Sequence, residues 1–204
     1  GFVRLKGETD DGEPGGMQGE VTLPMLLGQA GYTTQAVGKW HIGENIESQP
    51  QNVGYDDFYG FLSVSDMYTE WRDPHFFPEI VYSDARTEWI KNMPFNRCFV
   101  HATKGKEATN VEEVTIPVLS ELDEKWCRYS EDFIKKQAAS DKPWLLYHCT
   151  RGAHFDNYPH EKYLGKSPAK HPYKDTLLEL DEIMGRLVEA LRASGQLEDT
   201  LIFI

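Results

Sequence analysis

Apolar residues recur every three or four positions in three stretches of the chain, a spacing that predicts three helices. The first stretch follows Thr22, a residue type that caps helix N-termini, and ends at Gly31. The second stretch covers residues 118–139. The third and clearest covers residues 175–194, with Gly195 at the position of a C-terminal cap. Its apolar stripe consists of Leu177, Leu180, Met184, Leu187, Val188 and Leu191.

Shorter runs of apolar and β-branched residues predict strands over residues 32–40, 143–149 and 200–204. Residues 44–116 have no clear period and are rich in aromatic residues and turn formers, which predicts short irregular elements packed by aromatic side chains. Residues 1–20 are rich in glycine and acidic residues and predict a loop.

Helices and strands therefore alternate, which favours an α/β fold around a largely parallel sheet. In such sheets ligands bind beyond the carboxyl ends of the strands. Two polar segments, GKWHIG at residues 38–43 and RGAHFDN at residues 151–157, each follow a predicted strand. We therefore expect both segments to open onto one cleft.

The composition narrows the possible partners. Lysine and arginine total 21 and aspartate and glutamate total 33, which gives a net charge of −12. Such a field repels polyanions, so nucleic-acid binding is not expected, although a pocket with a few cations can still hold a small anionic substrate. Cys98, Cys127 and Cys149 include no CxxC pair, so a zinc knuckle is not supported. The chain has no run of 18 apolar residues, and no membrane span is expected.

The segment GKWHIG carries the first candidate chemistry. Lys39 and His41 are two residues apart, so in an extended segment they point to the same side. An ammonium can neutralise an oxyanion, and an imidazole can donate or accept a proton. Gly38 and Gly43 let the backbone turn sharply or approach a ligand closely. The alternative interpretation is a surface lysine and a partly buried histidine at a strand end.

The second candidate segment contains His154, which follows the predicted strand 143–149 after a short loop. A histidine in this place is more often structural than catalytic, and both interpretations stay open on spacing alone. Arg151 can add positive charge to a cleft or lie exposed in the loop. Among the remaining histidines, His148 is expected to pack inside the strand, and His160 and His171 to lie in loops near solvent.

Two further groups are weaker candidates. The paired carboxylates Asp10-Asp11 and Asp56-Asp57 can ligate a hard cation, but their turn-like settings favour solvated turns. An aromatic cluster could line a substrate pocket, although packing explains it equally well. This cluster consists of Trp71, His75, Phe76 and Phe77.

The wider string AGYTTQAVGKWHIG closely resembles the second signature of the sulfatase family. The resemblance implies that Lys39 contacts the sulfate ester and that His41 hydrogen-bonds the covalent nucleophile. Sulfatases also show a hydrophobic strand followed by a loop with an active-site histidine, a position that His154 occupies. Arg151 is a further substrate-binding candidate beside these residues. The terminal string GQLEDTLIFI resembles the segment that leads sulfatases into their metal-binding Asp-Asn-Gly loop.

The chain departs from the family pattern in two respects. The first sulfatase signature has a cysteine or serine before x-Pro-x-Arg, which becomes formylglycine, and none of the three cysteines has that context. The early aspartate pair that binds the divalent metal is also missing. The resemblance therefore implies that formylglycine and a calcium or magnesium ion belong to segments outside this chain, and that no metal ligand is in it. The chain alone is then expected to be inactive.

The resemblance implies an alkaline-phosphatase-like three-layer α/β/α sandwich and hydrolysis of a small-molecule or carbohydrate sulfate ester. Two alternatives stay open: a phosphonate monoester or phosphodiester hydrolase of the same superfamily, and a non-catalytic binding protein with this fold. The sequence leaves the compartment, the oligomeric state and the particular ester open. Residues 1–204 are expected to form part of one catalytic domain, with a loop at 1–20, a helix and strand at 21–43, an irregular insert plus helix at 44–140, and a strand, loop, helix and strand at 141–204.

Overall fold

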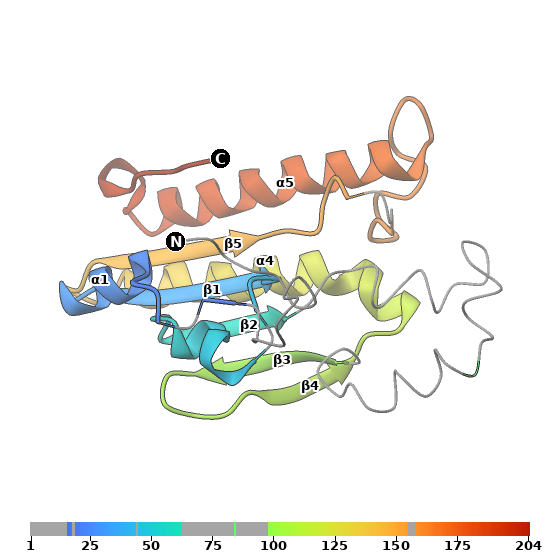
Figure 1. The fold of residues 1–204 in the computed structure, drawn as a ribbon. Coiled ribbons are helices and arrows are strands. Elements are labelled where there is room, and N and C mark those ends of the chain that lie inside the picture. Colours follow the sequence, from blue (N-terminus) through green and yellow to red (C-terminus); the bar gives the residue numbers. More distant parts are fainter. Residues whose placement is uncertain (1–15, 18, 44, 63–83, 85–97, 155–157) are drawn as a thin grey trace.

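A mixed five-stranded sheet lies at the centre of the fold, with helices on both of its faces (Figure 1). The computed structural model describes residues 16–17, 19–43, 45–62, 84, 98–154 and 158–204. The strand order across the sheet is β4-β3-β2-β1-β5. The strands are β1 (Thr33–Lys39), β2 (Asp57–Phe61), β3 (Cys98–Thr103), β4 (Thr109–Glu113) and β5 (Trp144–Cys149). This arrangement confirms the predicted α/β class.

Strand direction divides the sheet into two parts. β1 runs parallel to both of its neighbours, β2 and β5, whereas β3 is antiparallel to β2 and β4. The register pairs Gly38 of β1 with Cys149 of β5 and Lys39 of β1 with Phe61 of β2. The carboxyl ends of β2, β1 and β5 therefore lie at one edge of the sheet, which we call the carboxyl edge. The amino edge is where these three strands begin.

The three predicted helices are confirmed as α1 (Leu23–Gln29), α4 (Ile116–Gln137) and α5 (Pro172–Ala193). Each has a proline in its first turn, where the missing N–H costs no intrahelical hydrogen bond. The residue before each helix accepts a hydrogen bond through its side chain from a first-turn N–H. These capping residues are Thr22, Thr115 and His171. Three short 3₁₀ helices complete the described elements: η1 (Ile46–Ser48), η2 (Pro50–Asn52) and η5 (Leu197–Asp199).

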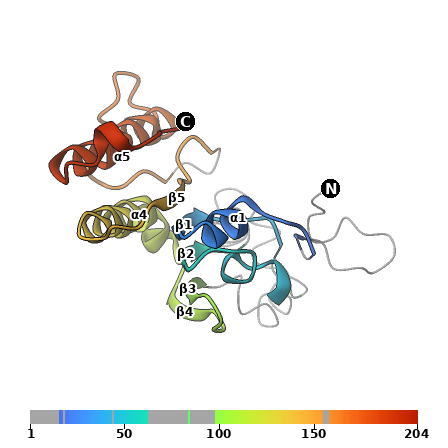
Figure 2. The ribbon, with the colours of Figure 1, turned by 90° about the vertical axis from the view of Figure 1, so that its left-hand side faces the viewer.

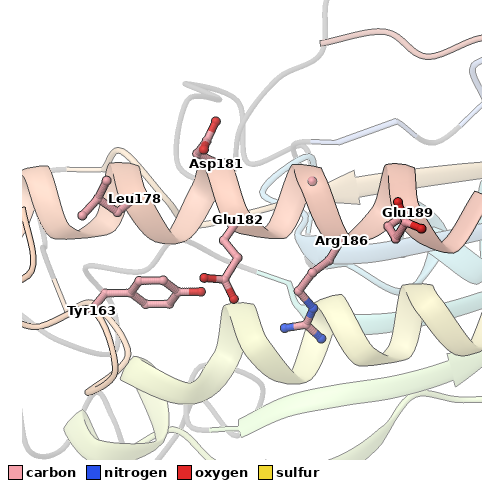
Figure 3. Close-up of a pocket in the computed structure, with 7 residues that line it drawn as sticks. Tyr163, Leu178, Asp181, Glu182, Arg186 and Glu189 are labelled. Atoms are coloured by element: carbon pink, nitrogen blue, oxygen red, sulfur yellow. The ribbon is translucent and has the colours of Figure 1, made fainter.

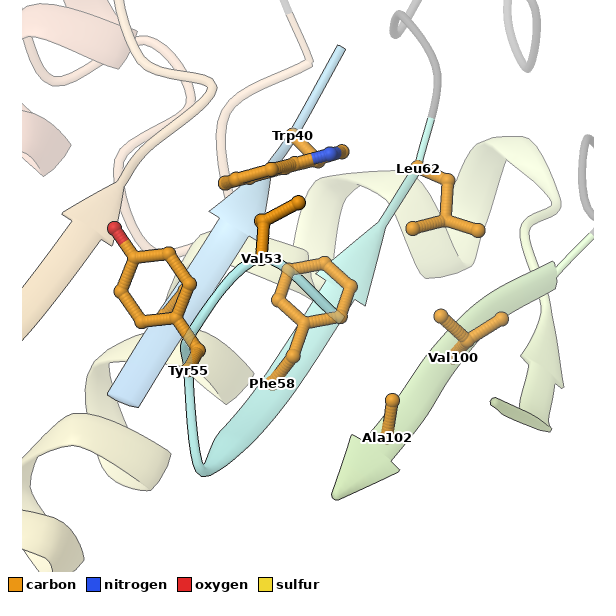
Figure 4. Packing of buried hydrophobic residues seen from close by; sticks show 8 residues of the cluster. Trp40, Val53, Tyr55, Phe58, Leu62, Val100 and Ala102 are labelled. Atoms are coloured by element: carbon orange, nitrogen blue, oxygen red, sulfur yellow. The ribbon is translucent and has the colours of Figure 1, made fainter. Parts of the chain in front are cut away.

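Two hydrophobic clusters fill the two faces of the sheet. On the α1 face, aromatic and aliphatic side chains from the strands and from the segment before β2 pack together with Trp40 (Figure 4). On the opposite face, α4 covers the sheet with Leu119, Leu122 and Trp126 fully buried. Figure 2 shows α1 and α4 on opposite sides of the strands, and α5 packs against α4. The result is the predicted three-layer arrangement.

Two sequence-based expectations were wrong. Within residues 44–116, the expected irregular region contains three strands, β2, β3 and β4. Residues 200–204, expected to form a strand, pair with none of the five described strands, and residues 201–204 are exposed. Asp10-Asp11 and the aromatic cluster at residues 71–77 lie outside the described residues.

Among the described residues, no helix is both long and apolar enough to cross a membrane. The Cys127 thiol is buried, and Cys98 and Cys149 are partly buried.

Candidate active site

The first candidate segment leaves β1 at the carboxyl edge through a tight passage. Gly38 has a φ of +99°, and a Cβ at this position would lie 1.8 Å from the Cys149 carbonyl oxygen. Only glycine fits there, because the backbones of β1 and β5 come this close. Lys39 ends the strand, and His41 has a φ of +48°, an uncommon conformation for a side chain other than glycine. The His41 N–H donates to the Leu62 carbonyl at 3.0 Å, which fixes that turn against the end of β2.

Trp40 anchors the segment between the two candidate residues. Its side chain is buried, and its indole Nε1–H donates to the Ser48 carbonyl at 3.0 Å. The ring meets Tyr55 and Phe58 edge-on, with centroid separations of 5.9 and 6.4 Å. Lys39 and His41 therefore extend from a backbone that is fixed by the α1-face core.

The second candidate segment leaves β5 at the same edge and is fixed to α4. The Asp123 Oδ1 atom accepts hydrogen bonds from the Thr150 hydroxyl at 2.8 Å and from the Arg151 N–H at 2.9 Å. The Arg151 guanidinium lies 3.6 Å from Asp123 Oδ2, and both side chains are 3% exposed. The same guanidinium donates to the Tyr158 carbonyl at 3.4 Å. Arg151 is thus buried and engaged with the protein, an arrangement that favours a structural role over substrate binding.

His154 follows in a tight turn. The Gly152 N–H donates to the Thr150 hydroxyl at 2.9 Å, and the His154 N–H donates to the Arg151 carbonyl at 3.3 Å. Ala153 between them has a φ of +67°. At the far end of this loop, the His160 N–H donates to Glu179 Oε2 of α5 at 3.1 Å. The loop is therefore tied to α4 at one end and to α5 at the other.

The sheet register brings the two candidate segments to neighbouring positions. β1 and β5 are adjacent parallel strands that end together, because Gly38 pairs with Cys149. Burial raises the pKa of the Cys149 thiol, and the positive charge of Lys39 acts against that rise. Lys39 is thus close enough to the end of β5 to affect its electrostatics. That Lys39, His41 and His154 share one cleft stays a prediction.

The other histidines have structural surroundings. The His148 Nδ1 atom lies 2.8 Å from the Ser130 hydroxyl of α4, and burial lowers the pKa of His148. The prediction that it packs inside the strand is confirmed. His171 caps α5, and the His160 ring accepts a hydrogen bond from the Lys162 N–H at 3.3 Å.

The paired carboxylates Asp56 and Asp57 lie at the amino edge and support the fold. Asp56 Oδ2 accepts from the Thr34 N–H at 3.0 Å. Asp57 is contacted by Gln35 Nε2 at 2.9 Å, the Tyr129 hydroxyl at 2.7 Å and His101 Nε2 at 2.8 Å. Within the part of the chain that the structure describes, no group of three or more histidine, cysteine, aspartate or glutamate side chains could hold a metal ion.

A hollow of about 590 Å³ opens beside α5 (Figure 3), and none of the candidate residues lines it. Arg186 in its wall joins α5 to α4 through Glu124 at 2.6 Å and Glu131 at 2.9 Å. The lining residues are Tyr163, Leu178, Asp181, Glu182, Gly185, Arg186 and Glu189. Its charged groups serve helix packing, so the carboxyl edge is the better candidate for chemistry.

Comparison with known proteins gives a consistent result. The family model described as Sulfatase matches residues 3–204. The N-acetylgalactosamine-6-sulfatase of Sus scrofa is 30% identical, and human arylsulfatase A is 26% identical, each over 90% of this chain. These alignments cover 32% and 34% of the two relatives, so the chain spans about a third of their length. The crystal structure of the PsFucS1 sulfatase from Pseudoalteromonas sp. superposes with a TM-score of 0.79 at 34% identity, over 88% of this chain and 36% of that one.

Proposed function

Because this chain belongs to the sulfatase family, we propose that the intact protein hydrolyses a sulfate ester at the carboxyl edge of the sheet. The observation that carries the proposal is the pairing of β1 with β5. This pairing brings the GKWHIG segment and the His154 loop, whose described residues are 150–154 and 158–160, to one edge, where α/β sheets bind ligands.

Lys39 is the cation of the proposed site. Lys39 is the last residue of β1, next to the end of β5, and in the proposal its ammonium group neutralises negative charge on the bridging oxygen as the S–O bond breaks. Its rigid support by the buried Trp40 means that little reorganisation is needed as that charge develops.

The two histidines have different roles in the proposal. His154 protonates the departing alcohol, a step that contributes most when the leaving group is a poor one. His41 hydrogen-bonds the covalent nucleophile from its turn at the end of β1. Arg151 contributes through its ion pair with Asp123, which fixes the start of the His154 loop.

Sulfatases generally use formylglycine and a divalent metal ion such as calcium or magnesium. We propose that segments outside this chain supply both, since the chain spans about a third of the length of its relatives. Such a metal ion stabilises anionic oxygens when it is bound. This chain contributes the lysine, the histidines and the scaffold that holds them.

The substrate class that we propose is a sulfated carbohydrate. One group of relatives is named for N-acetylgalactosamine 6-sulfate chemistry and shares 28–30% of its aligned residues with this chain. Sugar hydroxyls are poor leaving groups, which agrees with a general acid in the site.

A direct assay tests the proposal. The intact protein should hydrolyse 4-nitrophenyl sulfate and a sulfated amino sugar, with much higher kcat/KM for sulfate than for a phosphonate monoester or a phosphodiester. The isolated 204-residue chain should be no faster than buffer. A preference for phosphorus esters would assign the protein to a different hydrolase class, and binding of sulfated sugars without turnover would indicate a non-catalytic protein.

A further inference from the structure

The His154 loop is tied down at both ends by buried carboxylates from two different helices. Asp123 of α4 accepts hydrogen bonds from the Thr150 hydroxyl and the Arg151 N–H at the start of the loop. Glu179 of α5 accepts a hydrogen bond from the His160 N–H at the end of the loop. Both acidic side chains are almost fully buried, at 2% and 3% exposure. Burying a carboxylate is costly, so these two residues require an explanation.

The start of the loop is held by charge. Asp123 accepts two hydrogen bonds through one oxygen, and its other oxygen lies 3.6 Å from the Arg151 guanidinium. Hydrogen bonds to a buried carboxylate are strong and directional. Because Arg151 is also the acceptor for the His154 N–H at 3.3 Å, the backbone of His154 is one hydrogen bond away from this anchor.

The end of the loop is held by Glu179, a carboxyl group whose pKa is raised. Burial raises the pKa of Glu179 to about 7, and the negative charge of Asp123 adds to the rise. The positive charges of Arg151 and Lys162 act in the opposite direction. Its Oε1 atom is buried and has no hydrogen-bond partner among the described residues. Asp123 and Glu179 thus influence each other electrostatically, with Arg151 near both.

We propose that Asp123 and Glu179 are positioning residues that hold the His154 loop in its reactive geometry from α4 and α5. This inference rests on the proposed function, in which His154 is the general acid. A proton donor must stay within hydrogen-bond reach of the leaving oxygen, so small displacements of its loop reduce the rate.

Packing of the two helices does not account for this pair. Arg186 of α5 already bridges to Glu124 and Glu131 of α4, and among the described residues neither glutamate hydrogen-bonds to the His154 loop. Glu131 is therefore a matched control: a partly buried acid at the same interface that carries no loop contact.

Hydrogen exchange tests the proposal without reference to turnover. In the intact protein, Asp123→Ala and Glu179→Ala should raise the amide exchange rate of peptides within residues 150–160 by roughly tenfold, since each removes an anchor. Glu131→Ala should leave those peptides unchanged and affect α4 and α5 alone. Unchanged loop exchange in Glu179→Ala would overturn the proposal. So would equal acceleration in Glu131→Ala. If Asp123→Ala does not fold, Glu179→Ala decides the question alone.

Kinetics supply the second measurement. Both variants should lose about tenfold or more in kcat/KM for a sugar sulfate and distinctly less for 4-nitrophenyl sulfate, because only the poor leaving group needs the acid. Asp123→Asn should recover part of the loss, since its amide oxygen can still accept. Equal losses on both substrates would overturn a role through His154. A wild-type protein without sulfatase activity would reject the proposed function, and the exchange result would still decide the positioning role of the two acids.

Discussion

The amino edge and the carboxyl edge of the sheet both contain charged residues and histidines, but these residues have different surroundings at the two edges. At the amino edge the acids Asp56 and Asp57 are saturated by neighbouring side chains and backbone, and strands β1 and β2 start in ordinary conformations. At the carboxyl edge, His41 and Ala153 have positive φ values, two of the three such non-glycine residues in the described part of the chain.

This difference separates an edge that stabilises the sheet from one that holds two loops in uncommon backbone conformations. Left-handed backbone at non-glycine residues costs energy and persists where the surroundings enforce it, often at functional sites. The amino edge stores no such strain and devotes its charges to hydrogen bonds that hold the sheet against α4. At the carboxyl edge, the positive φ values of His41 and Ala153 lower the stability of the fold and fix the geometry of its two loops. Substitutions that affect one edge and spare the other can test this division.

The largest expected effect is at Gly38, where β1 and β5 come together. Gly38→Ala should destabilise the protein by more than about 4 kcal/mol, because the new Cβ would clash with the Cys149 carbonyl carbon and oxygen. Gly105→Ala, in the turn after β3, also has positive φ but meets no atom within 4 Å and should cost only about 1–2 kcal/mol. Urea unfolding of both variants measures the contrast. Similar losses of stability in the two variants would mean that the close approach of β1 to β5 at Gly38 does not require glycine.

The next effect concerns His154 at the carboxyl edge. His154→Ala should lower kcat/KM for sugar or alkyl sulfates by roughly 10²- to 10⁴-fold, the range for loss of a general acid. Activated aryl sulfates should lose much less. A series of leaving groups with graded pKa values measures this contrast. A uniform loss across the series would reassign His154 to binding the sulfate group.

Lys39 provides a charge-matched comparison between the edges. Lys39→Ala should reduce the rate of the chemical step by on the order of 10²-fold or more, as for loss of an oxyanion-stabilising group. Lys104→Ala removes the same charge at the amino edge, where it lies 3.4 Å from Asp56, and should change kcat by less than about twofold. Single-turnover rates on 4-nitrophenyl sulfate separate the two. Comparable rate losses in the two variants would mean that the total charge of the protein, and not the position of Lys39, supports the reaction.

Asp57 tests the stabilising edge. Asp57→Ala removes the acceptor for Gln35, Tyr129 and His101, and should cost about 2–3 kcal/mol of stability. Burial and the Asp57 carboxylate raise the pKa of Tyr129, so the phenol stays a donor and loses its partner in the variant. Thermal unfolding should reveal the loss, with kcat/KM of the remaining folded protein unchanged. A fall in kcat/KM would mean that Asp57 at the amino edge also affects the reaction at the carboxyl edge.

The most gradual effect is a pH slope from Glu179. Its folded-state pKa of about 7 exceeds the usual 4.5, so the folded protein holds a proton that the unfolded chain releases between these values. Stability from this group is therefore present below pH 4.5 and falls as pH rises through about 7, by at most about 1.4 kcal/mol per pH unit. Glu179→Gln should flatten that slope, measured by denaturant unfolding at several pH values. Burial raises the pKa of Glu179 most, Asp123 adds to the rise, and the His160 N–H, Arg151 and Lys162 oppose it.

The sequence predicted best the elements that have a clear local hydrophobic period. α4, α5, β1 and β5 were all found close to their expected limits, because apolar periodicity and capping residues define them locally. β4 escaped prediction because all five of its residues are exposed and show no alternation.

The supporting residues of the candidate site were also missed. Asp123 and Glu179 lie in amphipathic helices, where an isolated acid is normally solvent-exposed. Their burial depends on β5 and its loop packing between α4 and α5, which is tertiary information. A weak signal was present for Asp123, which directly follows the buried Leu122 in the apolar stripe of α4.

The pairing of β1 with β5 also has a kinetic consequence. Thr33 pairs with Trp144, so more than half of the chain lies between two neighbouring strands. A pairing of such high contact order forms slowly, because the loop-closure entropy must be overcome before the contacts stabilise it. On the ribosome, β1 must wait until β5 has been synthesised before the edge that carries Lys39 can form. During that interval, one side of β1 is an unpaired strand edge that is open to aggregation or to chaperone binding.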